Sequence, residues 1–444
     1  MKKIYFAVFV ITLTLLLSQI PATANVDQLS NMSTEWIRTG NRNAATDSGD
    51  IVLYNPAGIM KMSDGIHINF GNQTLIRRPE HKYNLGITGV EDTDRSHKQD
   101  SNDYFLPNFY CAYKKDDFGF FGGIYIPGGG ATVDFPQGSI NTKFIGAMTV
   151  MQSSGMITSF TDDYLEASSI YFAIEAGVAY KINEMVSTAF ALRYINAENE
   201  VKAGATFLNG TTEIPGMNPA KLDYTTDADG VGFILGFNLS PLEKLNIGMR
   251  YESEVELDFK TDLNRNDFDP AFDLADYNEK NRRDFPAMFG IGGEYRLNDK
   301  LTAEADFNWY FQKQADWGKS STGKDLSDLA GDCWSMGGTV GYQLNDKLLL
   351  SVGTLYTKFE WDDIDAYYET IGAFEALYTD NWHIGAGFAY SIHKNIKLNF
   401  ALGRTIWDDE TIEYVQAANN GLPAVQCDTE NATTTIAFGI DISL

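Results

Sequence analysis

The sequence of 444 residues has few cysteines, few prolines and, after its first 20 residues, no long hydrophobic run. Its three cysteines (Cys111, Cys333 and Cys427) are too few for a disulfide scaffold, although one bridge between Cys333 and Cys427 stays open. A polytopic helical membrane protein is excluded, because each span needs about 20 near-continuous apolar residues. Basic residues are also scarce, with 34 Lys+Arg against 60 Asp+Glu. We expect no nucleic-acid partner for such an acidic chain.

Catalytic signatures are missing as well. The chain contains no G-x-S-x-G, H-E-x-x-H or Walker sequence, and its five histidines are widely scattered. We therefore predict that the protein is not an enzyme and has no cofactor and no metal site. One alternative is a Ca²⁺ site in an acidic stretch, against the more common reading of solvated carboxylates. The stretch contains Asp262, Asp267, Asp269 and Asp273.

The N-terminus has the pattern of a secretory signal peptide. Lys2 and Lys3 precede an apolar stretch over residues 4–17, and Ala22-Thr23-Ala24 forms a small-residue cleavage site. The apolar stretch is short for a membrane anchor, which is the alternative. We expect residues 1–24 to be a signal peptide and the protein to be exported.

Aromatic residues and glycine are abundant, with Tyr 23, Phe 28, Trp 7 and Gly 40, as suits many β-strands. A repeated hairpin supports this interpretation: Tyr295–Leu301 and Tyr342–Leu348 both place a short polar turn between two alternating stretches. After the first turn Phe307 and Trp309 share one face of the strand, while Asp306 takes the other.

The alternation predicts fourteen strands. We place them at 64–75, 102–113, 118–128, 169–182, 186–202, 221–239, 244–260, 284–298, 300–314, 333–345, 347–360, 380–393, 396–408 and 432–444. Tight turns alternate with long polar loops, which include 129–168 and 203–220, so one end has tight turns and the other long loops. This arrangement favours an all-β, 14-stranded antiparallel transmembrane β-barrel of the outer membrane over a soluble β-sandwich or solenoid. The last strand should pair with the first and leave no open edge.

Three segments carry a resemblance to a known family. They are Tyr54-Asn55-Pro56-Ala57-Gly58-Ile59-Met60, the stretch from Gly122 to Gly128, and the stretch from Phe285 to Trp309. They resemble the FadL-like outer-membrane transporters of long-chain fatty acids and aromatic hydrocarbons. The resemblance implies an N-terminal hatch over residues 25–63, a barrel over residues 64–444, and transport of hydrophobic compounds by passive diffusion.

The resemblance also implies functional positions. Asn55, Pro56, Ala57 and Gly58 match the hatch motif of the family, although an ordinary turn before the first strand is the alternative. A lateral gate in the third strand is expected at Gly122, Gly123 and Pro127, because proline and glycine weaken a strand ladder. The alternative for Pro127 is a strand that ends before a long loop.

Charged residues are predicted to line the lumen if the alternate strand positions that carry the aromatic residues face lipid. The inward set is His67, Glu175, Lys181, Arg193, Arg250, Glu252, Glu254, Glu294, Arg296, Glu304, Asp306, Lys397 and Asp441. A salt-bridge network that holds the plug is favoured, because buried charges need partners. The sharper hypothesis is that Arg193 or Arg250 binds a ligand carboxylate.

The loop after the third strand is unusually apolar for a surface loop. We predict that it forms two short amphipathic helices that capture hydrophobic ligands, as in the FadL-like family; the alternative is packing on the barrel mouth. The capture residues are Phe144, Ile145, Met148, Met151, Met156, Ile157 and Phe160.

Together these features predict outer-membrane transport of hydrophobic small molecules by a monomer whose partners are its ligands and the outer-membrane lipids. The rival classes are a general polar-solute porin and an outer-membrane enzyme.

Overall fold

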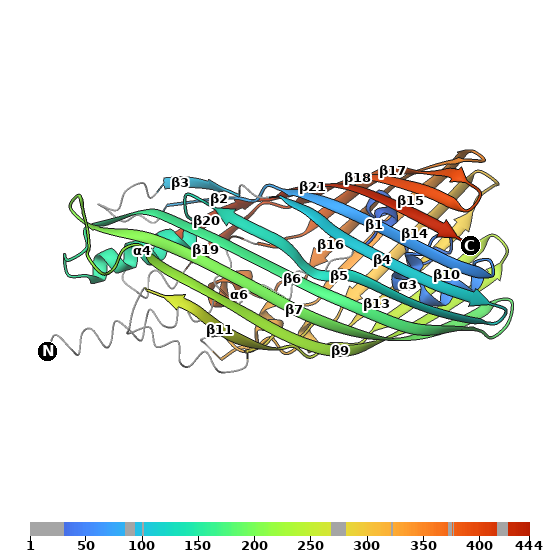
Figure 1. The fold of residues 1–444 in the computed structure, drawn as a ribbon, viewed down its shortest axis with the longest axis horizontal. Coiled ribbons are helices and arrows are strands. Elements are labelled where there is room, and N and C mark those ends of the chain that lie inside the picture. Colours follow the sequence, from blue (N-terminus) through green and yellow to red (C-terminus); the bar gives the residue numbers. More distant parts are fainter. Residues whose placement is uncertain are drawn as a thin grey trace.

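A computed structural model describes residues 31–84, 94–99, 102–267, 281–320, 323–371, 375, 377–414 and 425–444. The predicted signal peptide lies outside these residues. The chain forms a closed antiparallel barrel of 14 strands, which confirms the predicted fold class. Figure 1 shows the barrel lengthwise, with the C-terminus at the end that carries the tight turns. Among the described helices, none is long and apolar enough to cross a membrane.

The strands follow one another around the wall in chain order. They are β1 (Gly65–Arg77), β4 (Asp103–Lys115), β5 (Phe118–Phe135), β6 (Ser159–Lys181), β7 (Val186–Asn209), β9 (Ala220–Leu242), β10 (Leu245–Glu252) continued by β11 (Asp258–Asn266), β13 (Met288–Arg296) preceded by β12 (Asn281–Arg282), β14 (Leu301–Tyr310), β15 (Cys333–Asn345), β16 (Leu348–Phe359), β17 (Asn381–His393), β18 (Ile396–Trp407) and β21 (Ala432–Ser443). A two-residue strand, β8 (Thr212–Glu213), folds back on the end of β7.

The barrel closes through its first and last strands, as predicted. β1 pairs with β4 along one edge and with β21 along the other. His67 lies opposite Ser443, and Arg77 lies opposite Thr433 at the other end of the ladder. The wall therefore has no free edge along β1, as a sheet in lipid requires.

Side chains alternate between lipid and lumen. On β14, Glu304, Asp306 and Asn308 are buried in the lumen, whereas Phe307 and Trp309 on the opposite parity are partly exposed on the outside. The outer surface carries exposed aromatic and aliphatic side chains all around the wall. The predicted separation of a lipid-facing and a lumen-facing parity is confirmed.

Four strands, β5, β6, β7 and β9, are much longer than the sequence predicts. β6, β7 and β9 contain 23, 24 and 23 residues, whereas a bilayer crossing takes about 9–11. The predicted loop 129–168 is partly strand, since β5 continues to Phe135 and β6 begins at Ser159. The predicted loop 203–220 likewise contains the end of β7. Beyond the membrane these strands still pair with one another, but they no longer need the apolar outer face on which the prediction depended.

The seventh and eighth strands are interrupted. The predicted continuous strand 244–260 divides into β10 and β11. Between these two strands, the backbone N–H of Ser253 donates to the carbonyl of Phe233, and the Ser253 hydroxyl accepts from the N–H of Phe233. The predicted strand 284–298 becomes regular only at Met288, because Pro286 has no N–H to donate. A single bridge, between Val255 and Phe285, joins the two strands here.

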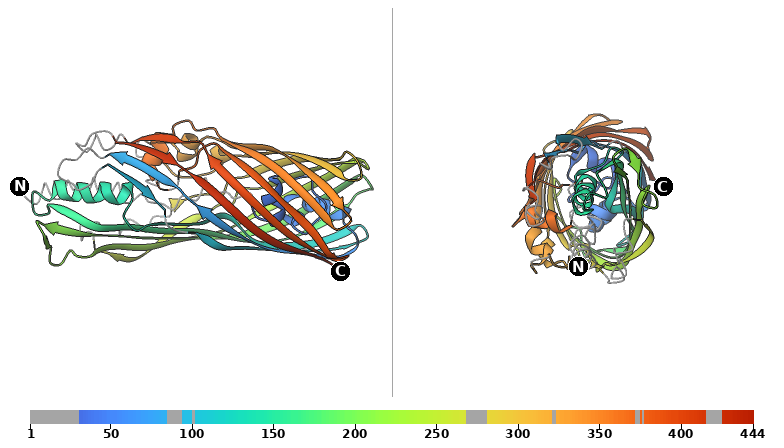
Figure 2. Two further views of the ribbon diagram at one scale, coloured as in Figure 1. Left: turned by 90° about the horizontal axis from the view of Figure 1, so that it is seen from above. Right: turned by 90° about the vertical axis from the view of Figure 1, so that its left-hand side faces the viewer.

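The N-terminal segment, residues 31–64, lies inside the barrel as far as Met60, near the tight-turn end (Figure 2). It contains α2 (Thr34–Thr39), α3 (Ile51–Tyr54) and the 3-10 helix η1 (Pro56–Lys61). Ser33 caps α2 by accepting a hydrogen bond from the backbone of Trp36, and Gly40 ends the helix in the left-handed conformation. All six residues of α2 are buried, so the helix is enclosed by the wall.

Two glycines of the wall let its backbone touch the backbone of this segment. A Cβ at Gly353 of β16 would collide with the carbonyl of Thr39, and a Cβ at Gly248 of β10 would collide with the carbonyl of Asn43. Glycine is required at such close approaches. The inner segment is thus seated directly on the wall.

The end with long loops has its own apolar core. It includes α4 (Ile140–Gln152), α5 (Leu326–Ala330), α6 (Ile364–Ile371), η3 (Gln312–Gln314) and a separate sheet of β2 (Glu80–Asn84), β3 (Asp94–Lys98), β19 (Glu410–Tyr414) and β20 (Val425–Glu430). Buried side chains at this end form one continuous cluster, which includes Tyr367 and Tyr368 of α6 and Trp317 from the segment between η3 and α5. The lumen is therefore bounded by packed structure at both ends.

The close approach at Gly353 generates a test. Gly353→Ala should lower the stability of the barrel by about 1–3 kcal/mol, because the methyl group displaces α2 from the wall. The midpoint of heat-induced loss of compact electrophoretic mobility measures this. Gly341→Ala is the control, since a Cβ there would meet only the tip of Leu349 at 3.6 Å. Equal midpoints for the two variants would contradict the seating of α2 on this glycine.

Candidate functional site

Wall carboxylates bind the backbone of the inner segment. Asp306 accepts hydrogen bonds from the backbone N–H groups of Arg42 (2.7 Å) and Asn43 (2.8 Å), and Glu304 accepts from that of Ala44 (3.1 Å). Both carboxylates were predicted to face the lumen. An irregular chain in a closed lumen needs partners for its N–H groups, and the wall supplies them.

An ion pair stabilises the inner segment itself. Arg42 donates from Nε and Nη2 to the two oxygens of Asp50, at 3.0 and 2.5 Å, which is a bidentate arrangement. Asp50 also accepts from the hydroxyl of Ser33 at 2.8 Å. Asp50, which precedes α3, thus binds both the residue that caps the start of α2 and a residue that follows its end, so the segment folds back on itself as one unit.

The Asn-Pro-Ala-Gly motif is a structural anchor. Asn55 donates from Nδ2 to the carbonyl of Ala45 (3.0 Å) and to Oδ1 of Asn238 on β9 (2.8 Å). A Cβ at Gly58 would collide with the Asn55 side chain, which explains the glycine. The functional part of the hatch interpretation stays a prediction.

The other two residues of the motif shape η1. Pro56 occupies its first turn, where a missing N–H costs nothing. The carbonyl of Ala57 accepts a hydrogen bond of 2.7 Å from the hydroxyl of Ser187 on β7. The motif is therefore attached to two neighbouring strands of the wall.

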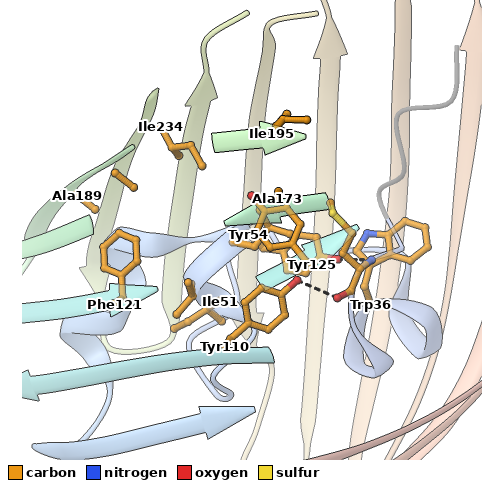
Figure 3. Packing of buried hydrophobic residues seen from close by; sticks show 14 of the residues in the cluster. Trp36, Ile51, Tyr54, Tyr110, Phe121, Tyr125, Ala173, Ala189, Ile195 and Ile234 are labelled. Carbon is orange, nitrogen blue, oxygen red and sulfur yellow. Dashed lines mark hydrogen bonds between the residues drawn. The ribbon is translucent and has the colours of Figure 1, made fainter. Parts of the chain in front are cut away.

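Aromatic side chains fill the space between the inner segment and β4–β5 (Figure 3). The hydroxyl of Tyr110 donates to the carbonyl of Met32 at 2.9 Å, and the ring of Tyr125 lies 5.8 Å from the ring of Tyr110. Tyr125 also donates to Glu175 at 2.6 Å. This side of the lumen is occupied by protein.

Arg193 and Arg250 share one carboxylate. Both form ion pairs with Glu252, with 2.9 Å between Nε of Arg250 and the carboxylate. Arg250 also donates to the carbonyl of Leu53 at 2.8 Å, and the Arg193 guanidinium lies 5.4 Å from the ring centre of Phe285. The salt-bridge interpretation thus has its partners in place. The carboxylate-binding role stays a prediction.

The wall is incomplete between β4 and β5. Their pairing is regular from Lys115–Phe118 up to Phe109–Ile124, and within the described residues no pair joins them beyond that point. β4 continues along β1, and β5 continues along β6 with register shifts after Tyr125 and after Gly129. Beyond Phe109 and Ile124, the edge of β4 that faces β5 and the edge of β5 that faces β4 are therefore unpaired within the described residues.

The three gate candidates lie around this break. Gly122 and Gly123 sit in the last regular part of the ladder, opposite Cys111 and Tyr110, and Pro127 lies inside the first register shift. Gly123 faces the lumen, where a Cβ would come within 2.7 Å of the Tyr110 ring. The structure brings the three residues together, but their role as a gate stays a prediction.

The predicted pair of capture helices is wrong in its second half. α4 covers the first apolar segment, whereas Ser159 already begins β6, so Phe160 is a strand residue. The second segment pairs with β7, whose Phe207 lies opposite Phe160, and a strand satisfies its backbone there. Ser139 caps α4 in a capping box with Thr142.

The capture residues divide into two groups. Phe144, Ile157 and Phe160 are buried in the outer core, as the packing alternative requires, and Ile145 is half-buried. Met151 and Met156 are exposed, by 46% and 66%. Met148 lies on α4, between Phe144 and Met151.

Two side predictions concern cysteine and calcium. Cys333 and Cys427 are free, buried thiols on β15 and β20, so the bridge between them is not formed. Asp269 and Asp273 lie outside the described residues, and no group of three metal-binding side chains occurs within the described part. Asp267 forms an ion pair with Arg265.

A partly open space remains in the lumen along the wall from β14 to β1. This cavity of about 160 Å³ is lined by α2 and by strands β14–β18, β21 and β1. Its lining includes Trp36, Tyr310, His383 and Trp407. These residues were not predicted from the sequence, because alternation along a strand shows which side chains face the lumen but not which of them leave a space.

A lipid-facing barrel of 14 strands, with a lumen that holds a hydrogen-bonded inner segment, defines an outer-membrane protein of the transport class. A sequence model described as "Outer membrane protein transport protein (OMPP1/FadL/TodX)" matches residues 15–443. The chain belongs to this family, which confirms the resemblance noted in the sequence. A search of curated proteins gives no match.

Solved structures share the fold. A FadL homologue from Pseudomonas aeruginosa is similar with a TM-score of 0.68 at 12% identity, over 94% of this chain and 99% of that chain. The toluene transporter TodX of Pseudomonas putida has a TM-score of 0.62 at 12% identity, over 94% and 99%. The toluene transporter TbuX of Ralstonia pickettii has a TM-score of 0.59 at 15% identity, over 94% and 98%.

A histidine outside the membrane generates a pH prediction. His81 on β2 is buried, stacks on His97 with ring centres 5.4 Å apart, and accepts a hydrogen bond of 3.3 Å from the backbone N–H of Ile140, the first residue of α4. Burial, and then His97, lower the pKa of His81 to about 3. Only neutral imidazole accepts this bond.

Since the folded pKa lies below the unfolded value of about 6.5, the stability that neutral His81 provides is present above pH 6.5 and is lost as the pH falls toward 3. We expect the protection of α4 against hydrogen exchange to decrease by about 1.4 kcal/mol per pH unit in that interval. His81→Asn, which keeps an acceptor but does not titrate, should weaken this dependence. An identical pH profile in the variant would disprove the role of His81.

Proposed function

We propose that the protein carries hydrophobic small molecules across the outer membrane by passive diffusion, through a plugged barrel with a lateral opening near β5. The observation that carries the proposal is the loss of β4–β5 pairing beyond Phe109 and Ile124. A ligand in the lumen at this height would have an exit toward lipid, whereas the route along the barrel axis is filled by the inner segment.

The filled lumen disfavours the alternative of a polar-solute porin. Residues 31–64 are hydrogen-bonded to several strands around the wall, among them β7, β9 and β14, so a continuous water-filled channel has no room at this level. An enzyme is disfavoured because the sequence shows no catalytic motif and because the buried carboxylates of Glu252 and Asp306 already bind the wall arginines and the inner segment.

The names of related structures support hydrophobic ligands. Toluene is the substrate in the names of TodX and TbuX, and a further similar structure, at a TM-score of 0.52 and 12% identity, is titled a monoaromatic hydrocarbon channel. We extend this class to the present chain, with long-chain fatty acids as the other member, and we expect a monomer surrounded by outer-membrane lipids.

The remaining site residues take roles within this proposal. The exposed Met151 and Met156 provide an adaptable apolar surface for initial capture. Arg193 remains the better carboxylate candidate, because its Nε and Nη2 atoms are buried without a hydrogen-bond partner among the described residues. Asn55 and the rest of its motif hold the plug in place.

A bulky residue beside the break tests the lateral opening. Gly122 faces lipid on the same side of β5 as Ile124, so the ring in Gly122→Phe would cover the point where β4 and β5 separate. We expect toluene and oleate uptake to fall about tenfold, which corresponds to a barrier raised by ~1.4 kcal/mol. Initial uptake rates in cells without another hydrophobic-compound transporter measure this effect.

The matched control is Gly293→Phe on β13, where a Cβ would meet nothing within 4 Å. For both variants, folding is first checked by the change in electrophoretic mobility on heating, so that uptake is compared only between folded barrels. Normal uptake by a folded Gly122→Phe protein would refute a lateral opening at this position.

A further inference from the structure

The cavity beside α2 is a partly open pocket whose lining contains none of the residues of the Arg193–Glu252 cluster. Its floor is Trp36 of α2, and its wall includes Leu355 of β16 and His383 of β17. The Trp36 and His383 rings lie 4.8 Å apart, and Nε2 of His383 donates a hydrogen bond of 3.0 Å to the carbonyl of Ile37. The floor is therefore fixed to the wall.

The size of the cavity restricts what it can hold. Its volume is about 160 Å³. An apolar protein cavity of about 150 Å³ holds one benzene molecule. The space thus holds a single six-membered ring with a small substituent, whereas most of an extended long-chain acyl group would lie outside it.

The lining is suited to a flat ring. Five aromatic side chains contribute to it: Trp36 from α2, Tyr310 from β14, Phe359 from β16, Tyr378 from the segment before β17, and Trp407 from β18. Aromatic rings prefer offset or edge-to-face neighbours at 4.5–7 Å between centres, so a ring in this space would have partners on several sides.

Three polar atoms of the lining lack partners. Oε1 of Gln312, Oδ1 of Asn431 and Nε1 of Trp407 are buried and make no hydrogen bond within the described part of the chain. Gln312 is only 2% exposed. Buried polar groups are nearly always satisfied, so these atoms indicate a missing partner. The set contains one donor and two acceptors, and a hydroxyl group can both accept from the first and donate to one of the others.

The charges of the lining exclude an anion as the preferred ligand. Arg77 is the single charged residue among the lining residues, and its Nε lies 3.7 Å from the carboxylate of Asp103. A ligand carboxylate would therefore compete with an existing ion pair and would lie beside uncharged groups, where an unpaired charge is costly.

We propose that this cavity binds a neutral single-ring compound that carries a hydroxyl group, such as a phenol or a cyclic alcohol. The ring occupies the aromatic lining, and the hydroxyl accepts from Trp407 and donates to Gln312 or Asn431. The inference deepens the proposed function by naming a substrate class, and it distinguishes hydroxylated rings from bare hydrocarbons and from fatty acids.

Equilibrium dialysis of the full chain in detergent, with radiolabelled phenol and toluene as probes, tests this proposal. Phenol should bind one-to-one and more tightly than toluene. Trp407→Phe keeps the ring but removes the N–H, and should weaken phenol binding about tenfold, the equivalent of one hydrogen bond, while toluene binding stays unchanged. Gln312→Met provides a second test at another atom, in case the first variant does not fold.

Two further variants control the assignment. Thr357→Phe places a ring in the cavity from β16 and should abolish saturable binding of both probes. The binding signal that remains in this variant measures partition of the probes into the detergent. Trp382→Phe makes the same chemical change on the lipid face, where Trp382 is 47% exposed, and should have no effect. Phenol binding that is no tighter than toluene binding, or that survives Thr357→Phe, would overturn the proposal.

The binding measurement does not depend on transport. Loss of the lateral-opening proposal, through normal uptake in Gly122→Phe, would leave phenol binding at the cavity intact. Loss of phenol selectivity would leave hydrophobic uptake intact. The two failures are therefore distinguishable.

Discussion

The structure depends on the hydrogen bonding of an irregular chain enclosed in a barrel. The inner segment has little regular secondary structure, so many of its backbone N–H and C=O groups have no partner within the segment. The surrounding wall also keeps bulk water away from these groups. Asp306 meets this need by accepting from two consecutive N–H groups, and Glu304 accepts from a third. Because each such pair joins inner segment to wall, the barrel and its contents form one cooperative structure.

This constraint makes the two sides of the lumen different. The side of β4–β7 is filled by tyrosines and the arginine–glutamate cluster, and there the wall loses its pairing after Ile124. The opposite side, at β15–β18, keeps regular ladders and a cavity under the outer core. In the proposed function, a ligand would therefore be held in the cavity beside β15–β18. It would be released at the interruption between β4 and β5.

The period of two residues made the barrel predictable from sequence. Phe307 and Trp309 mark the strand face that contacts lipid, and Asp306 marks the face that lines the lumen. The tight turns show that consecutive strands are neighbours. The ends of β6 and β7 were missed, because strands beyond the membrane pair without an apolar outer face. Phe160 was predicted in a helix although it pairs in β6, since a short apolar run fits either structure. The cavity at Trp407 depends on packing between distant strands, which no local pattern records.

The central claim is that the hydrogen-bonded inner segment closes the barrel to water-soluble solutes. Osmotic swelling of liposomes that contain the full-length protein, challenged with a small neutral sugar, tests it most directly. We predict no swelling above that of protein-free liposomes, because residues 31–60 occupy the lumen. Rapid swelling, at the rate of an open porin, would contradict it.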